Sequence, residues 1–409
     1  MEVKSRSESS SPCLACGTTG MRTILDFGPQ AAANLLCTSP SETVRRERLG
    51  LDYCPACGHA QQTVFYPPKD LFEHYLYASG TTRTLASYFD WLAQAIAQDA
   101  GIGSTVLDIA SNDGSFLRAL AKAGLTPTGV EPAANLVAIA RQDGLEVMEG
   151  FWPQTGAGLR FDRIVGMNVL AHGPDPLAFL TGVQQALSPG GVALIQVSQA
   201  DMFRNFEFDT LYHEHYSFFC PNSLTTLARR AGFSAFAFIK TNIHGGSILA
   251  VLGQSQTDVD RTAACLTQGE YYLETLAATE RPADASADRF AQRANATCAS
   301  IRALETLSRE AGRTFVLVGA AAKAITVLQA SGARFDRVID EAPLKIGRYI
   351  PGTALQIESF DALISIDGPC TFLIGAWNFK TEIDDKIKQR RAAPDLSATY
   401  FPTLSIDFM

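Results

Sequence analysis

Apolar and polar residues alternate along the chain in blocks, and the middle block has the clearest pattern. In TVLDIASNDGSFLRALAKAG (105–124), an apolar run precedes a small-residue turn, and apolar residues at helical spacing follow. Further apolar runs occur at TPTGVE, FDRIVGM, ALIQV, SAFAFIKT and SILAVL, and LSPGG (187–191) reads as a turn before ALIQV. This order predicts a seven-stranded Rossmann-like sheet that ends in a hairpin.

The remaining chain divides into three further parts. Residues 312–409 repeat the strand and helix alternation on a smaller scale, which predicts a second Rossmann-like α/β domain. The polar, amphipathic stretch 256–311 predicts long helices interrupted near Pro282. Residues 1–75 hold five of the nine cysteines and predict a metal-binding domain, which leaves 76–255 as the central domain.

Two matched CxxCG motifs carry four of these cysteines. Cys13 and Cys16 form the first pair, and Cys54 and Cys57 form the second. Each pair directs two thiolates at one ion from a tight turn, and four thiolates complete the tetrahedron of a structural zinc site. The alternatives are two unrelated turns that happen to carry thiols, or a redox CxxC, which needs a thioredoxin-like strand and helix that the sequence lacks.

The turn in DIASNDGSF (108–116) indicates the cofactor. Asp108 ends the first strand, and Gly114 opens the helix where the backbone is expected to pass close to a ligand. Ala110 and Asn112 stand where a dinucleotide fingerprint has glycine, which disfavours a pyrophosphate. Glu131 ends the second strand, where an acid binds two ribose hydroxyls. A cofactor with ribose and no phosphate is S-adenosylmethionine, and a doubly wound domain without cofactor is the weaker alternative.

The expected cofactor contacts cluster at the ends of these strands. They are Asp108, Ala110, Asn112, Asp113, Gly114, Glu131, Pro132 and Asn168.

Charge and composition exclude several classes of function. The net charge is -8 and the pI is near 5.4, so a nucleic-acid partner is disfavoured. No apolar run reaches the roughly 18 residues of a membrane helix, and the first residues lack the apolar core of a signal peptide. We therefore expect a cytoplasmic protein with thiols rather than disulfides, and a monomer or weak homo-oligomer.

The motifs together resemble one enzyme family. The CxxCG pairs, DIASNDGSF, GVEPAANL, NVLAH, FDTLYHEHYSFF, HGGSI, GAAAK and GRYIPGT are similar to those of the sugar C-methyltransferases. The resemblance implies methylation of a carbon next to the ketone of a nucleotide-linked 4-keto deoxysugar, in the biosynthesis of a natural product. The expected nucleotide is dTDP. The alternatives are C- or O-methylation of a small molecule that is not a sugar, and an adaptor with a vestigial methyltransferase fold.

Methylation of such a carbon requires a base, an oxygen-stabilising donor and close alignment of the reacting carbon. The segment DTLYHEHYSFF (209–219) follows the fifth strand, at the edge where open α/β sheets bind ligands. His215 is the expected base because histidine titrates near neutrality. Glu214 would orient an imidazole or bind a hydroxyl, and Tyr212 would donate to the ketone oxygen. By resemblance, Tyr77 and His172 line the same cavity; the alternative is a buried polar network.

Candidate substrate contacts occur later in the chain. Lys323 stands in GAAAK, where a helix N-terminus favours an anion such as a diphosphate. Arg348 and Tyr349 of GRYIPGT form a second candidate anion contact, and His244 of HGGSI is a candidate sugar contact. The alternatives are an exposed Lys323 and a solvated turn at His244. By resemblance, the C-terminal domain closes over the nucleotide-sugar.

Overall fold

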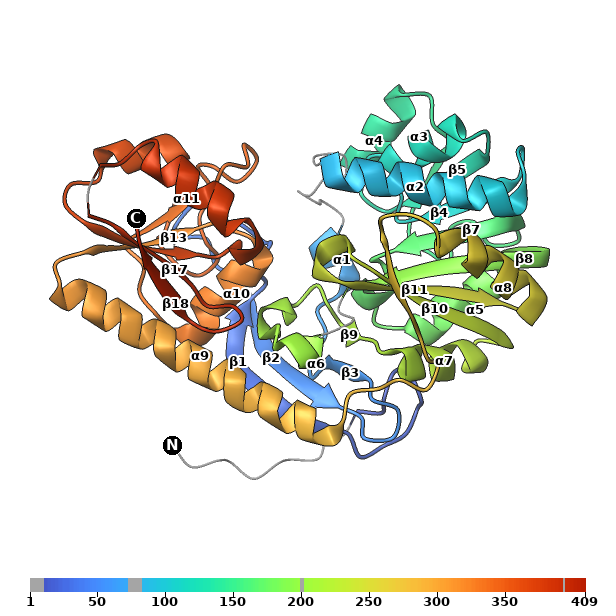
Figure 1. Ribbon diagram of the computed structural model, residues 1–409, viewed down its shortest axis with the longest axis horizontal. Helices are drawn as coiled ribbons and strands as arrows, with labels where there is room; N and C mark the ends of the chain where they lie inside the picture. The colour runs from blue at the N-terminus through green and yellow to red at the C-terminus, as the bar shows by residue number, and fades with distance from the viewer. Residues whose placement is uncertain (1–10, 73–82, 199–201, 393) are drawn as a thin grey trace.

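Three β-sheets organise the chain (Figure 1). The computed structural model describes residues 11–72, 83–198, 202–392 and 394–409. The central sheet and the C-terminal sheet form two lobes, and the N-terminal sheet lies between them at their base. Among the described helices, none is long and apolar enough to cross a membrane.

The central sheet contains the expected strands and one more. In spatial order the strands are β12 (Tyr272–Leu276), β10 (Ala235–Thr241), β11 (Ser247–Gly253), β8 (Leu187–Val197), β7 (Phe161–Met167), β4 (Thr105–Ile109), β5 (Thr126–Glu131) and β6 (Val147–Glu149). The strands from β6 to β8 are parallel, and β11 is antiparallel to both of its neighbours. The order in which the strands follow one another along the chain reverses between β4 and β7. The carboxyl ends of these two strands are therefore the expected ligand site.

Two predictions about strands were wrong. The segment 256–311 is not helical throughout, because β12 pairs with β10 and extends the sheet to eight strands. Apolar and polar residues alternate only weakly in the five residues of β12, and most of these residues are exposed. Only pairing with a neighbouring strand therefore makes this segment a strand. LSPGG is also part of β8 rather than a separate turn, with a register shift against β7 at that point.

Helices cover both faces of the central sheet. One face packs against α2 (Arg83–Ala100), α3 (Ser115–Lys122), α4 (Ala134–Gln142) and α8 (Gln256–Leu266), and the other packs against α5 (Pro176–Ala186) and α7 (Pro221–Arg230). Strand β8 shows why: Val192 and Leu194 face the first group, whereas Ala193 and Ile195 face the second. A parallel sheet needs apolar residues on both faces, which explains its continuous apolar strands.

The C-terminal sheet has six strands around a parallel core. In spatial order they are β15 (Ile357–Glu358), β14 (Arg337–Ile339), β13 (Thr314–Val318), β16 (Cys370–Ile374), β17 (Leu396–Thr399) and β18 (Ser405–Phe408). Only β18 is antiparallel to its neighbour. Helix α10 (Ala322–Ser331) follows β13, and α11 (Lys380–Lys388) follows β16 after the short η6 (Trp377–Phe379).

The N-terminal sheet shares its core with its neighbours. Its strands are β1 (Arg22–Ala31), β2 (Arg46–Tyr53), β3 (Ala60–Gln62) and β9 (Ser217–Phe218), and α1 (Pro68–Phe72) follows β3. Strand β9 belongs to the DTLYHEHYSFF segment, so this segment completes the sheet. Helix α9 (Asp284–Glu310) runs beneath both the N-terminal and C-terminal sheets (Figure 1), and Phe290, Ala294 and Ile301 are buried in their common core.

Candidate active site and metal centre

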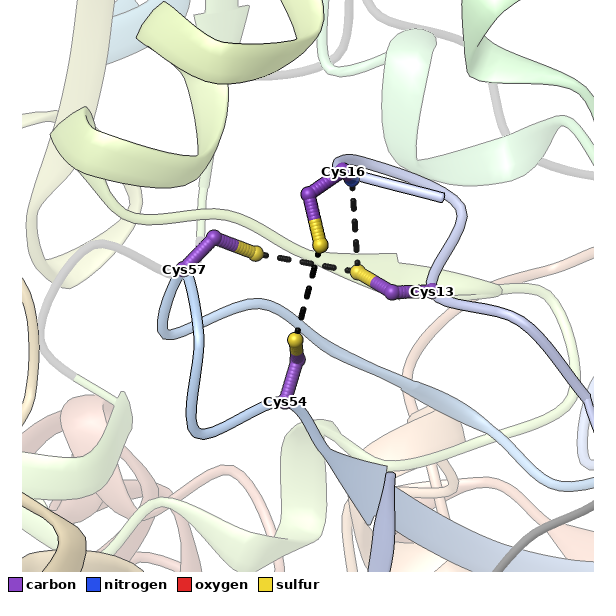
Figure 2. Close-up of side chains that lie close together, drawn as sticks. All are labelled: Cys13, Cys16, Cys54 and Cys57. Atoms are coloured by element: carbon purple, nitrogen blue, oxygen red, sulfur yellow. Dashed lines mark hydrogen bonds between the residues drawn. The ribbon is translucent and has the colours of Figure 1, made fainter. Parts of the chain in front are cut away.

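The four predicted zinc ligands converge in space (Figure 2). Their sulfur atoms all lie within 4.8 Å of one another. The Sγ atoms of Cys13 and Cys57 are 3.6 Å apart, as are those of Cys16 and Cys54. Tetrahedral zinc with Zn–S bonds of about 2.3 Å places its sulfur ligands about 3.8 Å apart. The cluster therefore fits a closed four-thiolate zinc site with no position left for a substrate.

The two CxxCG turns have the same local geometry. The amide of Gly17 donates to the Cys13 carbonyl, and the amide of Gly58 donates to the Cys54 carbonyl, each at 2.8 Å. The two glycines have φ values of 78° and 79°, a region that residues with a side chain rarely adopt. The trailing glycine thus lets each turn close, as the motif predicted.

The zinc-binding turns are attached to the rest of the molecule. The Arg230 guanidinium of α7 donates to the Ala15 carbonyl at 2.7 Å, and the Arg281 guanidinium donates to the Pro55 carbonyl at 2.6 Å. Each arginine therefore holds one of the two turns. Because these turns lie next to β9, the zinc site fixes the surface on which the DTLYHEHYSFF segment packs.

Glu131 closes the turn that is expected to hold the cofactor. Its carboxylate accepts from the Asn112 amide at 2.9 Å and from the Ala133 amide, just beyond Pro132, at 2.8 Å. Burial raises the pKa of Glu131. Burial, followed by the charge of Glu131, raises the pKa of Asp108 well above its ordinary value. An acid held by main-chain donors at the end of β5 retains lone pairs for ribose hydroxyls.

Unusual backbone conformations mark the same edge of the sheet. Ala110, Asn112 and Asn168 have φ values of 61°, 51° and 54°, although none is a glycine. Such conformations are rare and concentrate at ligand sites. Asn168 is also held by Gln196, whose side-chain amide donates to its Oδ1 at 3.3 Å, and Tyr88 donates to Gln196 in turn. The sequence analysis missed Gln196, although a glutamine inside an apolar strand was a visible signal.

Gly114 meets two requirements of the protein itself. A Cβ at this position would lie 2.4 Å from Leu145 Cδ1 and 3.0 Å from Ala140 Cβ. The backbone therefore passes close to the protein's own α4 region, and φ of 77° adds a second requirement for glycine. Asp113 has a local role as well, because its Oδ1 accepts from the Ser115 amide at the start of α3, at 3.1 Å.

His215 and Tyr212 form a hydrogen-bonded pair. His215 Nδ1 lies 2.9 Å from the Thr210 carbonyl, which only accepts, so Nδ1 carries the hydrogen. Nε2 then holds a lone pair and accepts from the Tyr212 hydroxyl at 2.8 Å. His172 packs beside this pair, with 4.8 Å between the imidazole centroids, and its Nδ1 donates to the Glu214 carbonyl at 2.6 Å.

Burial keeps both imidazoles neutral. It lowers the pKa of His172 to about 4. Burial, followed by the charges of His172 and Lys323, lowers the pKa of His215 well below its ordinary value, against the opposing effect of the Thr210 carbonyl. At neutral pH His215 is therefore a neutral proton acceptor with one nitrogen directed at Tyr212.

The other members of the YHEH motif face the N-terminal sheet. His213 donates from Nε2 to the Glu47 carbonyl at 3.2 Å and packs edge-on against Tyr66. Glu214 is 1% exposed, and its Oε1 accepts from the Asn34 amide at 3.2 Å. Burial raises the pKa of Glu214 to about 7. The outer residues of the motif, Tyr212 and His215, therefore pair with each other near His172, and the two inner residues contact the N-terminal domain.

Lys323 of the C-terminal domain approaches this cluster. Its ammonium lies 3.8 Å from a Glu207 carboxylate oxygen and 5.2 Å from the centre of the Trp377 ring. Its charge is one of the causes that lower the pKa of His215, after burial and the neighbouring His172. His244 is exposed in η4 (Ile243–Gly245) with φ of 55°. The Lys323 side chain is thus 32% exposed and lies beside Glu207 and Trp377.

The second candidate anion contact lies elsewhere. Tyr349 exchanges two main-chain hydrogen bonds with Cys37, at 2.9 and 3.0 Å, and the charge of Arg348 acts on Glu42. Within the described ranges, no hydrogen bond or ion pair joins Arg348 or Tyr349 to Lys323. The predicted Tyr77 lies outside the described residues.

The C-terminal domain repeats the arrangement around Glu131. Asp340, directly after β14, accepts from the Ala320 amide at 2.7 Å and from the Ala342 amide at 2.8 Å. Here, however, Lys345 donates to the Ala320 carbonyl at 3.0 Å and lies 3.7 Å from Asp340. The sequence analysis missed both residues, although an acid at the end of a second strand was the signal used for Glu131.

These features define a class of protein. A switch-point turn with an acid after the second strand, on this sheet order, is the cofactor site of an S-adenosylmethionine-dependent methyltransferase, and here it is joined to a four-cysteine zinc domain.

Comparison with known proteins identifies the family. A family model described as a zinc binding domain matches residues 13–72, one described as a methyltransferase domain matches 73–236, and one described as a C-methyltransferase C-terminal domain matches 242–395. The C-methyltransferase NovU of Streptomyces niveus is 28% identical over 92% of each chain. An ubiquinone biosynthesis O-methyltransferase of Dinoroseobacter shibae is 30% identical, but covers 32% of this chain and 60% of its own.

The three models follow one another along the chain from residue 13 to residue 395, and the protein is an S-adenosylmethionine-dependent C-methyltransferase. The family expected from the motifs is therefore confirmed, as are S-adenosylmethionine and structural zinc as its cofactors.

Proposed function

We propose that the enzyme methylates the carbon next to the ketone of a nucleotide-linked 4-keto deoxysugar, in the biosynthesis of a branched sugar for a natural product. The observation that carries the proposal is the pairing of Tyr212 with His215, whose Nε2 holds a lone pair. A neutral imidazole beside a phenol can take a proton from a carbon made acidic by a ketone, and the burial that keeps it neutral also lowers its basicity in the protein without substrate. Oxygen methylation does not require this step.

The cofactor supplies the methyl group, and the residues of this chain prepare the acceptor carbon. His215 takes the proton, directly or through the Tyr212 hydroxyl, which is 2.8 Å away. Tyr212 then donates to the enolate oxygen. His172 and Glu214 lie in the same cluster and are alternative proton acceptors, as is Tyr77.

The nucleotide part of the substrate is assigned to the C-terminal domain. Lys323 at the start of α10 lies beside Glu207 and Trp377, and Lys345 donates to the Ala320 carbonyl in the turn before α10. Two ammonium groups and a helix N-terminus favour a diphosphate. Arg348 and Tyr349 remain a separate candidate anion contact, beside Cys37 of the N-terminal domain.

Proton exchange tests the proposal directly. The enzyme is incubated in deuterated water with dTDP-4-keto-6-deoxyglucose and without methyl donor, and deuterium next to the ketone is measured by mass spectrometry. We expect exchange in the parent enzyme and a loss of about 100- to 10,000-fold in His215→Asn. Full exchange in His215→Asn, with loss in His172→Asn, Glu214→Gln or Tyr77→Phe, would move the base to that residue.

The same assay separates the alternatives. If the parent enzyme exchanges no proton of any nucleotide-linked ketosugar in a panel, the substrate proposal is wrong. A non-sugar ketone that exchanges instead would support the alternative of a small molecule that is not a sugar.

A further inference from the structure

Tyr212 and the proposed base His215 are connected to the C-terminal domain through a short series of buried hydrogen bonds. His215 Nδ1 donates to the carbonyl of Thr210, which ends the one-turn helix η3 (Phe208–Thr210). The neighbouring residue, Asp209, is 1% exposed. Its Oδ2 accepts from Trp377 Nε1 at 2.9 Å and from the Tyr400 hydroxyl at 3.1 Å. Both donors belong to the C-terminal domain.

The turn around η3 is held by its own hydrogen bonds and by contacts from the C-terminal domain. Phe206 has φ of 60°, a conformation that a bulky side chain adopts only when its surroundings impose it. Glu207, the next residue, is paired with Lys323 of the C-terminal domain at 3.8 Å. The Thr210 hydroxyl donates to the Glu207 carbonyl at 2.7 Å. Contacts from the C-terminal domain thus fix both ends of the turn that presents the Thr210 carbonyl.

We propose that Asp209 is a positioning residue through which the C-terminal domain sets the tautomer of His215. With Asp209 held by Trp377 and Tyr400, the Thr210 carbonyl faces Nδ1 and keeps the hydrogen there. The lone pair then remains on Nε2, toward Tyr212. This inference rests on the proposed role of His215, but the tautomer itself is a property of the protein without substrate.

The arrangement implies that the C-terminal domain positions Asp209 in addition to binding the substrate. The Trp377 ring that donates to Asp209 also faces the Lys323 ammonium and stacks on Phe401 at 4.0 Å. An anion bound by Lys323 therefore acts on the same indole that holds Asp209. Binding of the substrate's charged group by Lys323 and alignment of His215 are coupled through the Trp377 side chain.

The test measures the tautomer of His215 by nitrogen-15 NMR of the full-length, zinc-loaded enzyme, with the signal assigned by its loss in His215→Gln. The variants are Asp209→Leu, which removes the acceptor, and Trp377→Phe, which keeps an aromatic ring against Lys323 and Phe401 but lacks the N–H. The matched control is Trp152→Phe, which removes an indole N–H that donates to the Phe179 carbonyl, remote from η3.

We expect the parent and Trp152→Phe to show hydrogen on Nδ1, and the ratio of tautomers to shift toward Nε2–H by about five- to tenfold in Trp377→Phe and further in Asp209→Leu. Exchange of dTDP-4-keto-6-deoxyglucose should fall in the same order while S-adenosylmethionine affinity is unchanged. An unchanged His215 spectrum in folded Trp377→Phe overturns the inference, whether or not Asp209→Leu folds. Absence of exchange in the parent with the predicted tautomer shifts overturns the substrate proposal alone.

Discussion

Glu214 offers a test of the site's electrostatics that needs no substrate. The side chain is 1% exposed, and burial raises its pKa to about 7 from an ordinary value of 4.5. An acid with a raised pKa binds its proton more tightly in the folded protein. Stability is therefore highest below the unfolded pKa, falls as the pH rises between the two values, and reaches its full loss above the folded value.

The magnitude follows from this gap. Each unit between the folded and unfolded pKa values corresponds to about 1.36 kcal/mol. Relative to low pH, the raised pKa of Glu214 therefore lowers the free energy of unfolding by about 3 kcal/mol at about pH 8 and by about 1.4 kcal/mol at about pH 5.5. Glu214→Gln removes this cost and keeps a carbonyl for the Asn34 amide. The variant should gain about 2 kcal/mol more at the higher pH than at the lower.

Urea unfolding at the two pH values measures the difference. Glu149→Gln is the matched control, because it makes the same chemical change at a side chain on β6 that is 50% exposed. An equal gain for Glu214→Gln at both pH values would refute the reasoning, since the carboxyl would then titrate normally. Loss of proton exchange in the same variant would separately indicate a role in the reaction.

Three further predictions follow from the sites. Cys54→Ser should release zinc, measured by metal analysis, and lower the melting temperature, because one thiolate of the closed shell is lost; zinc retained at full occupancy would contradict this. Glu131→Ala should weaken S-adenosylmethionine binding by about 10- to 100-fold in calorimetry, and also lower stability because the Asn112 amide loses its acceptor; unchanged affinity with altered turnover would show that the acid has another role. Tyr212→Phe should slow exchange and methyl transfer by about tenfold or more without abolishing either, since His215 remains, and complete loss of exchange would make Tyr212 the proton acceptor itself.

Local patterns were sufficient for the zinc ligands, for the strand and turn that hold the cofactor, and for the family. A CxxCG turn closes through the hydrogen bond from Gly17 to Cys13 within five residues, so the sequence contains all of its determinants. The acid that ends β5 is nearly as local, because its partner Ala133 is two residues away and Asn112 is 19 residues away, in the turn that follows the adjacent strand β4. These interactions are short in sequence, and each residue type is required for a local chemical reason.

Contacts between distant segments decided the rest. β12 is a strand only because β10 offers it an edge, and Leu145, 31 residues away, leaves no room for a side chain at Gly114. Within YHEH the spacing could not tell which imidazole faces which partner, because Glu47 lies 166 residues from His213. The link from Trp377 to Asp209 spans 168 residues. A sequence shows which groups can ionise or donate, but only packing places a carbonyl beside one nitrogen of His215 and so determines where its lone pair points.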